Sequence, residues 1–210
     1  MVFKEANKTL ALEFYANARF SRRRYGSYVR GKDIDYSPQA INDMLKIVPL
    51  EKRDVQRRRD TCGGETWDEV KSLLCVEGAQ WQGSKRMLLK AEFKPAAKAW
   101  ASFVVNTLEG TSCSSKIPLP RVHIIAAIMD GAPINVGELI SNNIADFATS
   151  NKKAIPHISL INWLCEEAEC DLFVNDLGAL VMKPITDKYM EVFLKDYLKC
   201  MQQLGAVKEA

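Results

Sequence analysis

The sequence predicts a mainly α-helical protein, a single globular domain of about seven helices with a minor β-hairpin near residues 25–36. Three observations support this prediction. Hydrophobic residues recur at spacings of three and four through most of the chain, as on one face of a helix. Proline or a small polar residue precedes several of these segments, as at helix starts. Only the stretch near residues 25–36 has the shorter rhythm of strands.

The N-terminal part contains the first predicted helix and the hairpin. Leu10, Phe14 and Ala18 form an apolar stripe in a helix predicted over residues 4–18. The next segment, YGSYVRGKDIDY, places apolar residues on both sides of a turn at Gly31. A two-stranded hairpin is marginally stable alone, so we expect it to pack on the helices.

Two further helices follow the hairpin. Ser37, followed by proline, is a typical N-cap, and Pro49 ends the helix that begins there. Residues 51–64 have almost no apolar side chains and predict an exposed connection. Thr66 and Glu69 then fit a capping box at the start of the next helix.

The stretch from residue 92 to residue 140 predicts three successive helices at the centre of the core. The helix beginning at Pro95 is apolar over a wide arc, so we expect Trp100 to be buried. Truncating a buried tryptophan to alanine typically costs about 3–5 kcal/mol. The second helix, over 118–129, should end in a left-handed cap at Gly131, and Asn135 should cap the third.

The C-terminal part predicts a helix over 156–169, a less regular segment over 171–182 and a last helix over about 184–204. Apolar residues of the last helix resemble a coiled-coil seam but span only two to three heptads. We therefore expect residues 1–182 to form the domain and residues 183–210 to form a C-terminal helix packed on it.

Composition places the protein among ordinary globular proteins. The 210 residues are 47% hydrophobic and 26% charged. The N-terminus lacks the apolar core of a secretory signal, and no apolar run approaches the roughly 20 residues of a membrane span. The six cysteines include no CxxC pair, so free thiols are expected. We expect an intracellular protein of the nucleus or cytoplasm, neither secreted nor membrane-bound.

Basic residues are concentrated in the N-terminal third. Residues 19–59 contain twelve Lys and Arg against five Asp and Glu, whereas the rest of the chain carries a net charge of −4. Such clusters are typical of contacts with DNA or RNA phosphates, and also of nuclear-import signals. The alternative is a solvated surface on which the cations pair with neighbouring acids. The candidate nucleic-acid-binding residues are Arg22, Arg23, Arg24, Lys52, Arg53, Arg57, Arg58 and Arg59.

The sequence identifies no catalytic residue, metal site or cofactor. Residues 78–85 approach a phosphate-binding loop, but Ser84 precedes Lys85 and a helical pattern precedes both, which favours an ordinary loop. Cys165, Cys170 and His157 lack zinc-site spacing. His123, within an apolar helix, is interpreted as a hydrogen-bonded core residue. A magnesium-dependent nuclease requires converging carboxylates. No pattern in the sequence selects them, so Asp130, Glu138, Asp146 and Asp176 are only arbitrary candidates for the metal ligands.

Six short segments resemble, in order, a family of plant proteins known as putative plant transposon protein domains. The segments are LEFYANA at 12–18, VRGK at 29–32, SPQAIN at 37–42, FKPAAKAW at 93–100, APINVGELI at 132–140 and ISLINWLC at 158–165. The resemblance implies a transposable-element-derived plant protein, often encoded within a longer polyprotein. It carries over no catalytic residue. Members often have His where Cys113 stands here, which puts in doubt any site built on that loop.

Together these patterns predict a non-catalytic nucleic-acid-binding or structural module derived from a transposable element. One alternative is a transposase-like nuclease that uses Mg²⁺. Another is a capsid-like protein that self-associates through its C-terminal helix.

Overall fold

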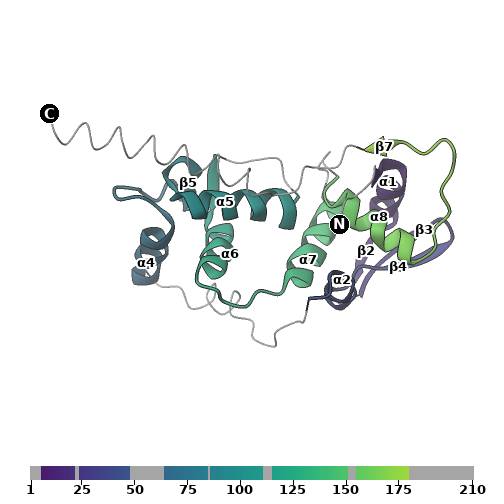
Figure 1. Ribbon diagram of the computed structural model, residues 1–210, viewed down its shortest axis with the longest axis horizontal. Coiled ribbons are helices and arrows are strands. Elements are labelled where there is room, and N and C mark those ends of the chain that lie inside the picture. The colour runs from purple at the N-terminus through teal and green to yellow at the C-terminus, as the bar shows by residue number, and fades with distance from the viewer. Residues whose placement is uncertain are drawn as a thin grey trace. The chain divides into compact units, whose positions relative to one another are not determined.

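The computed structural model describes residues 6–21, 24–47, 64–84, 86–110, 115–150 and 155–179 (Figure 1). Its contacts divide the chain into two compact units. Unit 1 comprises residues 1–50, 107–111 and 135–183, and unit 2 comprises residues 51–106, 112–134 and 184–210. The predicted boundary between residues 182 and 183 lies outside the described residues, as does the predicted last helix, and both stay predictions.

The predicted mainly helical architecture is confirmed. The described residues form seven α-helices: α1 (Lys8–Asn17), α2 (Pro38–Leu45), α4 (Gly64–Leu74), α5 (Pro95–Phe103), α6 (Leu119–Met129), α7 (Val136–Thr149) and α8 (Ile158–Glu167). A 3-10 helix over Lys90–Glu92 precedes α5, and a π-helix over Val104–Leu108 follows it. None of the described helices combines the length and apolar character needed to cross a membrane.

Within the described residues, three small antiparallel sheets accompany the helices. The largest has the order β2-β3-β4, where β3 is Arg24–Val29 and β4 is Lys32–Asp35. These two strands confirm the predicted hairpin, whose turn contains Gly31 with φ +79°. The other strands lie outside the segment that was predicted to form a hairpin. They are β2 (Arg19–Ser21), the pair β1 (Ala6–Asn7) and β7 (Gly178–Ala179), and the pair β5 (Met87–Leu89) and β6 (Lys116–Pro118).

Small polar side chains start α2 and α7 of unit 1 as their positions in the sequence predict, whereas α1 begins at Lys8 and not at residue 4. The Ser37 hydroxyl accepts a hydrogen bond from the N–H of Ala40 at 3.3 Å, and proline occupies the first turn of α2. The Asn135 side chain accepts from the N–H of Glu138 at 3.1 Å at the start of α7. Each cap satisfies an amide that has no partner within its helix.

Helices α2 and α7 meet at a junction of Asn42, Asn135 and Gly137. The Asn42 carboxamide accepts from the N–H of Gly137 and donates to Asn135 Oδ1, both at 2.9 Å. Asn42 is 1% exposed, so these hydrogen bonds satisfy a polar group that water does not reach. The junction joins two of the segments that resemble the plant family, residues 37–42 and 132–140. Packing and hydrogen bonding between α2 and α7 account for their residues at the junction.

The core of unit 1 lies between α1, α2, α7, α8 and the inner side of the β2-β3-β4 sheet. The Phe14 and Tyr36 rings meet edge to face with centroids 5.4 Å apart, a favoured geometry for buried aromatics. Ser141 on α7 donates to the carbonyl of Tyr36 at 2.8 Å. Ile41, Ile144 and Ile161 are fully buried around this centre.

The core of unit 2 lies between α4, α5, α6 and the β5-β6 pair. It is built from fully or almost fully buried side chains: Leu74, Leu88, Phe93, Ile117, Ile124 and Ile125. His123 is also buried, at 2% exposure, as its apolar surroundings in the sequence predict. Gly131 ends α6 with φ +65°, which confirms the predicted left-handed cap.

Two predictions about unit 2 are wrong. Trp100 is 39% exposed, because the buried positions of α5 are the small residues Ala97, Ala99, Ala101 and Ser102, and the bulky ring lies outside them. Helix α4 begins at Gly64, two residues before the expected cap at Thr66. The predicted exposed connection covers residues 51–64; its last residue, Gly64, begins α4, and residues 51–63 lie outside the described part of the chain.

Candidate nucleic-acid interface

The inner side of the β2-β3-β4 sheet is fastened to the helices of unit 1. Ser27 and Val29 on β3 are 5% and 0% exposed, and the Ser27 hydroxyl donates to the carbonyl of Phe14 on α1 at 2.7 Å. The Tyr25 hydroxyl donates to Asn142 Oδ1 on α7 at 2.8 Å. These contacts hold one side of the sheet against the core and fix which residues point to the other side.

The opposite side of the sheet, which we call the outer face, carries two cations and a tyrosine. Side chains alternate along a strand, so Arg24, Gly26 and Tyr28 of β3 share one side. Arg24 is exposed, and Tyr28 is 52% exposed. Register places Arg19 of β2 directly opposite Gly26. The residues of the outer face are Arg19, Ser21, Arg24, Gly26, Tyr28, Asp33 and Asp35.

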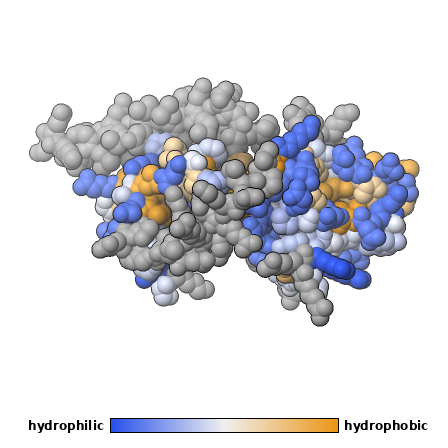
Figure 2. Space-filling view, turned by 90° about the horizontal axis from the view of Figure 1, so that it is seen from below, coloured by the Kyte–Doolittle hydropathy of each residue, from blue (hydrophilic) through white to orange (hydrophobic). Residues whose placement is uncertain are grey.

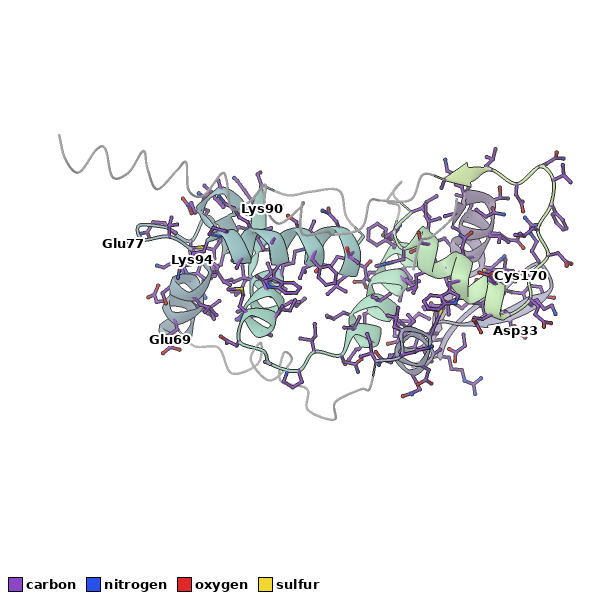
Figure 3. The ribbon with its side chains drawn as sticks, in the orientation of Figure 1. Asp33, Glu69, Glu77, Lys90, Lys94 and Cys170 are labelled. Carbon is purple, nitrogen blue, oxygen red and sulfur yellow. The ribbon has the colours of Figure 1, made fainter. Side chains whose placement is uncertain are left out.

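The charges of the outer face are separated by strand. Arg19 and Arg24 lie on β2 and at the start of β3, whereas Asp33 and Asp35 lie on β4, opposite Tyr28 and Gly26. Figure 3 labels Asp33 on β4. Asp35 accepts from the N–H of Ser37 at 2.8 Å and from its hydroxyl at 3.1 Å. A polyanion would therefore be attracted to the β2 side and repelled by the β4 side.

An acidic groove extends the β4 side away from the two arginines. It has a volume of about 630 Å³ and includes Asp33, Asp35, Asp43 and Glu167, with Lys46 as its one basic lining residue among those described. The apolar side chains of Met44 and Leu164 also line it. The groove does not suit phosphate, and it confines any nucleic-acid contact on this sheet to the β2 side.

Arg30, at the hairpin turn, is not part of this interface. Its guanidinium forms ion pairs with Glu13 at 2.8 Å and with Asp176 at 2.7 Å, and its side chain is 8% exposed. Arg30 Cζ lies over the Phe173 ring, 3.9 Å from the ring centroid. Burial opposes its charge, but hydrogen bonds to Asp176 and Glu13 outweigh this and raise the Arg30 pKa. Arg30 thus holds α1, the hairpin turn and the 171–177 segment together.

Of the predicted candidate residues, the structure places Arg24 on the outer face. Arg22 and Arg23 connect β2 to β3 in the sequence but lie outside the described residues. The second predicted cluster also lies outside the described residues: Lys52, Arg53, Arg57, Arg58 and Arg59. Sequence reasoning missed Arg19 and Tyr28. The available signal for Tyr28 was its position between Ser27 and Val29, which are buried, whereas Arg19 reaches the same side through its pairing with Gly26.

The carboxylates nominated for a metal site do not lie together. Asp130 ends α6 in unit 2, whereas Glu138 and Asp146 stand eight positions apart on α7. Asp176 accepts hydrogen bonds from the N–H of Phe173 at 2.9 Å and from Arg30, and these lower its pKa. Within the described ranges, no three His, Cys, Asp or Glu side chains are grouped to hold a metal ion.

The described thiols are buried or partly buried within the fold. Cys75, Cys165 and Cys170 are free. Burial raises the pKa of Cys75 and of Cys165 to about 12, so neither is a thiolate nucleophile at neutral pH. Cys170, labelled in Figure 3, follows α8, and its thiol donates to the carbonyl of Val29 at 3.5 Å.

The model of one protein family matches most of the chain. Its description is "Putative plant retrotransposon-related domain", and it matches residues 2–171. The chain belongs to this family. It is therefore a plant retrotransposon-related domain, of transposable-element origin, as the six resembling segments predict. No curated protein and no solved structure gives a significant match.

The match includes both strands that carry the outer-face cations and ends within the segment that follows α8. The retrotransposon-related domain thus contains the whole β2-β3-β4 sheet, with Arg19, Arg24 and Tyr28, as well as the α2–α7 junction.

Proposed function

We propose that this retrotransposon-related domain is a non-catalytic nucleic-acid-binding module. The supporting observation is that Arg19 and Arg24, 5 residues apart in the sequence, lie on the same exposed side of the sheet, next to exposed Tyr28. Arg22 and Arg23 stand between them in the sequence. Four arginines within six positions form a compact source of positive charge for phosphate.

Phosphate contacts by these arginines have a measurable salt dependence. Each neutralised phosphate of a single strand contributes about −0.7 to the slope of log affinity against log salt concentration. If all four arginines contact phosphates, the slope is about −2.8, and affinity falls about 50-fold between 50 and 200 mM salt. Binding by this one cluster is therefore expected to be weak and not sequence-specific.

The test measures fluorescence anisotropy of labelled 15-nucleotide single-stranded DNA and RNA titrated with the full chain. The Arg19→Gln/Arg24→Gln variant should bind more weakly and lose about 1.4 from the salt slope. The Lys8→Gln/Lys116→Gln variant has the same net charge but changes exposed lysines away from the outer face, and should bind as the unaltered chain does. Absence of binding at 50 mM salt, or equal weakening by both double variants, would refute the proposal.

The same titration separates the nuclease alternative. Repeating it with Mg²⁺ and resolving the products on a denaturing gel reports strand cleavage directly. Metal-dependent cleavage that a single substitution of Asp130, Glu138, Asp146 or Asp176 abolishes would establish catalysis in place of simple binding.

One observation favours self-association as a second function, through a surface other than the predicted C-terminal helix. In the segment between α8 and β7, the residues Leu172, Val174 and Leu177 are 73%, 104% and 60% exposed. Figure 2 shows hydrophobic residues, in orange, at the surface among hydrophilic ones. The segment is nonetheless held in place, because Leu177 accepts at its carbonyl from the N–H of Lys8 at 2.7 Å. An ordered apolar surface of this kind is typical of protein–protein contacts.

We propose a second copy of this chain as the partner of that surface. Sedimentation velocity at several protein concentrations tests the idea. Self-association that the Leu172→Ser/Val174→Ser variant weakens, and that a Val76→Ser control leaves unchanged, would support it. A monomer at all concentrations would refute it.

A further inference from the structure

Gly26 lies at the centre of the outer face, where neither backbone nor packing requires glycine. Its φ lies outside the left-handed region, and a Cβ built on it would approach no atom closer than the carbonyl of Ile34 at 4.0 Å. Glycine within a strand is normally unfavourable because it loses much backbone freedom on folding and contributes no packing. Its presence leaves a patch of bare backbone open to solvent.

Four side chains border this patch. Arg24 and Tyr28 lie two positions before and after Gly26 on the same strand, so their Cα atoms are about 13 Å apart. Arg19 faces Gly26 across β2, and Asp35 faces it across β4. The patch is thus bounded by Tyr28 at one end, a cation at the other end, a cation on the β2 side and a carboxylate on the β4 side. The Tyr28 side chain reaches toward the hairpin turn, where its hydroxyl would lie 3.9 Å from a Cβ on Gly31.

We propose that this patch binds an unpaired nucleobase, stacked beside Tyr28 over the Gly26 backbone, and that the domain therefore selects single-stranded nucleic acid. The inference rests on the proposed nucleic-acid binding and names its substrate class. An aromatic ring beside positive charge is the combination with which single-strand-binding surfaces hold a base and its phosphate.

The charge distribution across the outer face favours one orientation of a bound single-stranded nucleic acid. Arg19 and Arg24 attract phosphates along the β2 side, while Asp33 and Asp35 repel them from the β4 side. A single strand can satisfy both conditions by keeping its backbone over β2 and turning its bases toward Gly26. A duplex cannot, because it hides the faces of its bases in the stack and carries a second phosphate backbone.

Two substitutions test the patch in opposite ways. Tyr28→Leu removes the ring and should weaken single-strand binding about 5- to 150-fold, the range of one base–aromatic stack. Gly26→Thr fills the patch with a residue that strands favour, so it should weaken binding while leaving thermal stability unchanged or higher. A change that weakens binding without loss of stability cannot be attributed to unfolding.

Matched controls lie elsewhere in the chain. Trp100→Leu removes an aromatic ring from a residue of unit 2 that is 39% exposed. Gly178→Thr adds a side chain to a strand glycine where a Cβ would have no other atom within 4 Å. Both controls should bind as the unaltered chain does. The probes are a labelled 15-nucleotide single strand and the corresponding 15-base-pair duplex, each titrated with the full 210-residue chain.

Each outcome decides between the two proposals. Tighter binding of the single strand, lost in Tyr28→Leu and Gly26→Thr, supports the patch. If duplex and single strand bind equally and neither variant changes this, the inference is overturned while the proposed nucleic-acid binding stands. If neither probe binds at 50 mM salt, both are overturned. Unchanged binding by Gly26→Thr alone overturns the role of the bare backbone.

Discussion

Replacing Gly137 with alanine is expected to destabilise unit 1, although alanine favours a helix. Gly137 is the second residue of α7, and there alanine is normally better than glycine by up to about 1 kcal/mol. In this structure, however, an added Cβ would overlap the carbonyl oxygen of Pro38 and approach Asn42 Cγ to 2.7 Å and Nδ2 to 2.8 Å. Helix propensity and packing therefore predict opposite signs.

The magnitude follows from the displacement that relieves the overlap. Carbon atoms in good contact are about 3.5–4.0 Å apart, so α2 and α7 must separate by roughly 1 Å. Overpacking of this kind costs about 1–3 kcal/mol. The separation also strains the hydrogen bond between Gly137 N–H and Asn42 Oδ1, and an unsatisfied buried partner costs about 1–3 kcal/mol. After the gain in propensity of up to about 1 kcal/mol, we expect a net loss of about 1–5 kcal/mol.

The assay is urea unfolding followed by circular dichroism, with amide hydrogen exchange of peptides covering α2 and α7. Exchange assigns the loss to the junction even if the two units unfold separately. Gly26→Ala is the control, because its Cβ has space, and should leave stability unchanged or raise it by up to about 1 kcal/mol. A Gly137→Ala protein as stable as the unaltered chain, or more stable, would refute this account of the junction.

Three further outcomes are expected. Ser37→Ala should cost about 1 kcal/mol in urea unfolding, because the N–H of Ala40 loses its cap. Burial lowers the pKa of His157, which pairs with Asn143, to about 4. The neutral ring therefore stabilises the fold fully above the unfolded pKa near 6.5, and the free energy of unfolding should fall as the pH drops from 6.5 toward 4. Unfolding curves measured at each pH should show this dependence in the unaltered chain but not in the His157→Asn variant. Trp100→Ala should cost less than about 2 kcal/mol by thermal unfolding, below the value for a buried tryptophan, because 39% of the residue is exposed.

Local signals in the sequence predicted the parts of the fold that depend on local chemistry. Ser37 and Asn135 cap their helices because a side-chain oxygen needs only to reach an amide three residues away. Gly31 and Gly131 adopt positive φ at a turn and a helix end for equally local reasons. Such positions are readable without knowing what packs against the segment.

Features that depend on distant partners were not readable in this way. The exposure of Trp100 is decided by which side of α5 contacts the rest of unit 2, and the apolar arc of that helix is too wide to choose a side. Gly137 looked like an ordinary helix residue, since its role depends on α2, which lies over 90 residues earlier.

The candidate interface was predictable in kind but not in composition. The concentration of arginine pointed to the N-terminal third, and Arg24 does lie on the outer face. Tyr28 joins it through alternation along β3. Arg19 joins it only through the pairing of β2 with β3, and the short run of residues 19–21 does not indicate that β2 is a strand. Charge is visible in composition, whereas the side of a sheet on which a charge lies requires the register.

The bond between Asn42 and Asn135 spans 93 positions of the sequence, and this separation has a consequence for synthesis. At about 5–20 residues per second, a ribosome needs roughly 5–19 s to add the residues between them. During that interval the sheet and α2 have emerged without α7, and the side chains of Tyr36 and Ile41, fully buried in the finished protein, have no helix to cover them. The N-terminal half of this protein therefore passes through a period with apolar side chains uncovered, and the duration of that period is set by how quickly the residues between α2 and α7 are translated.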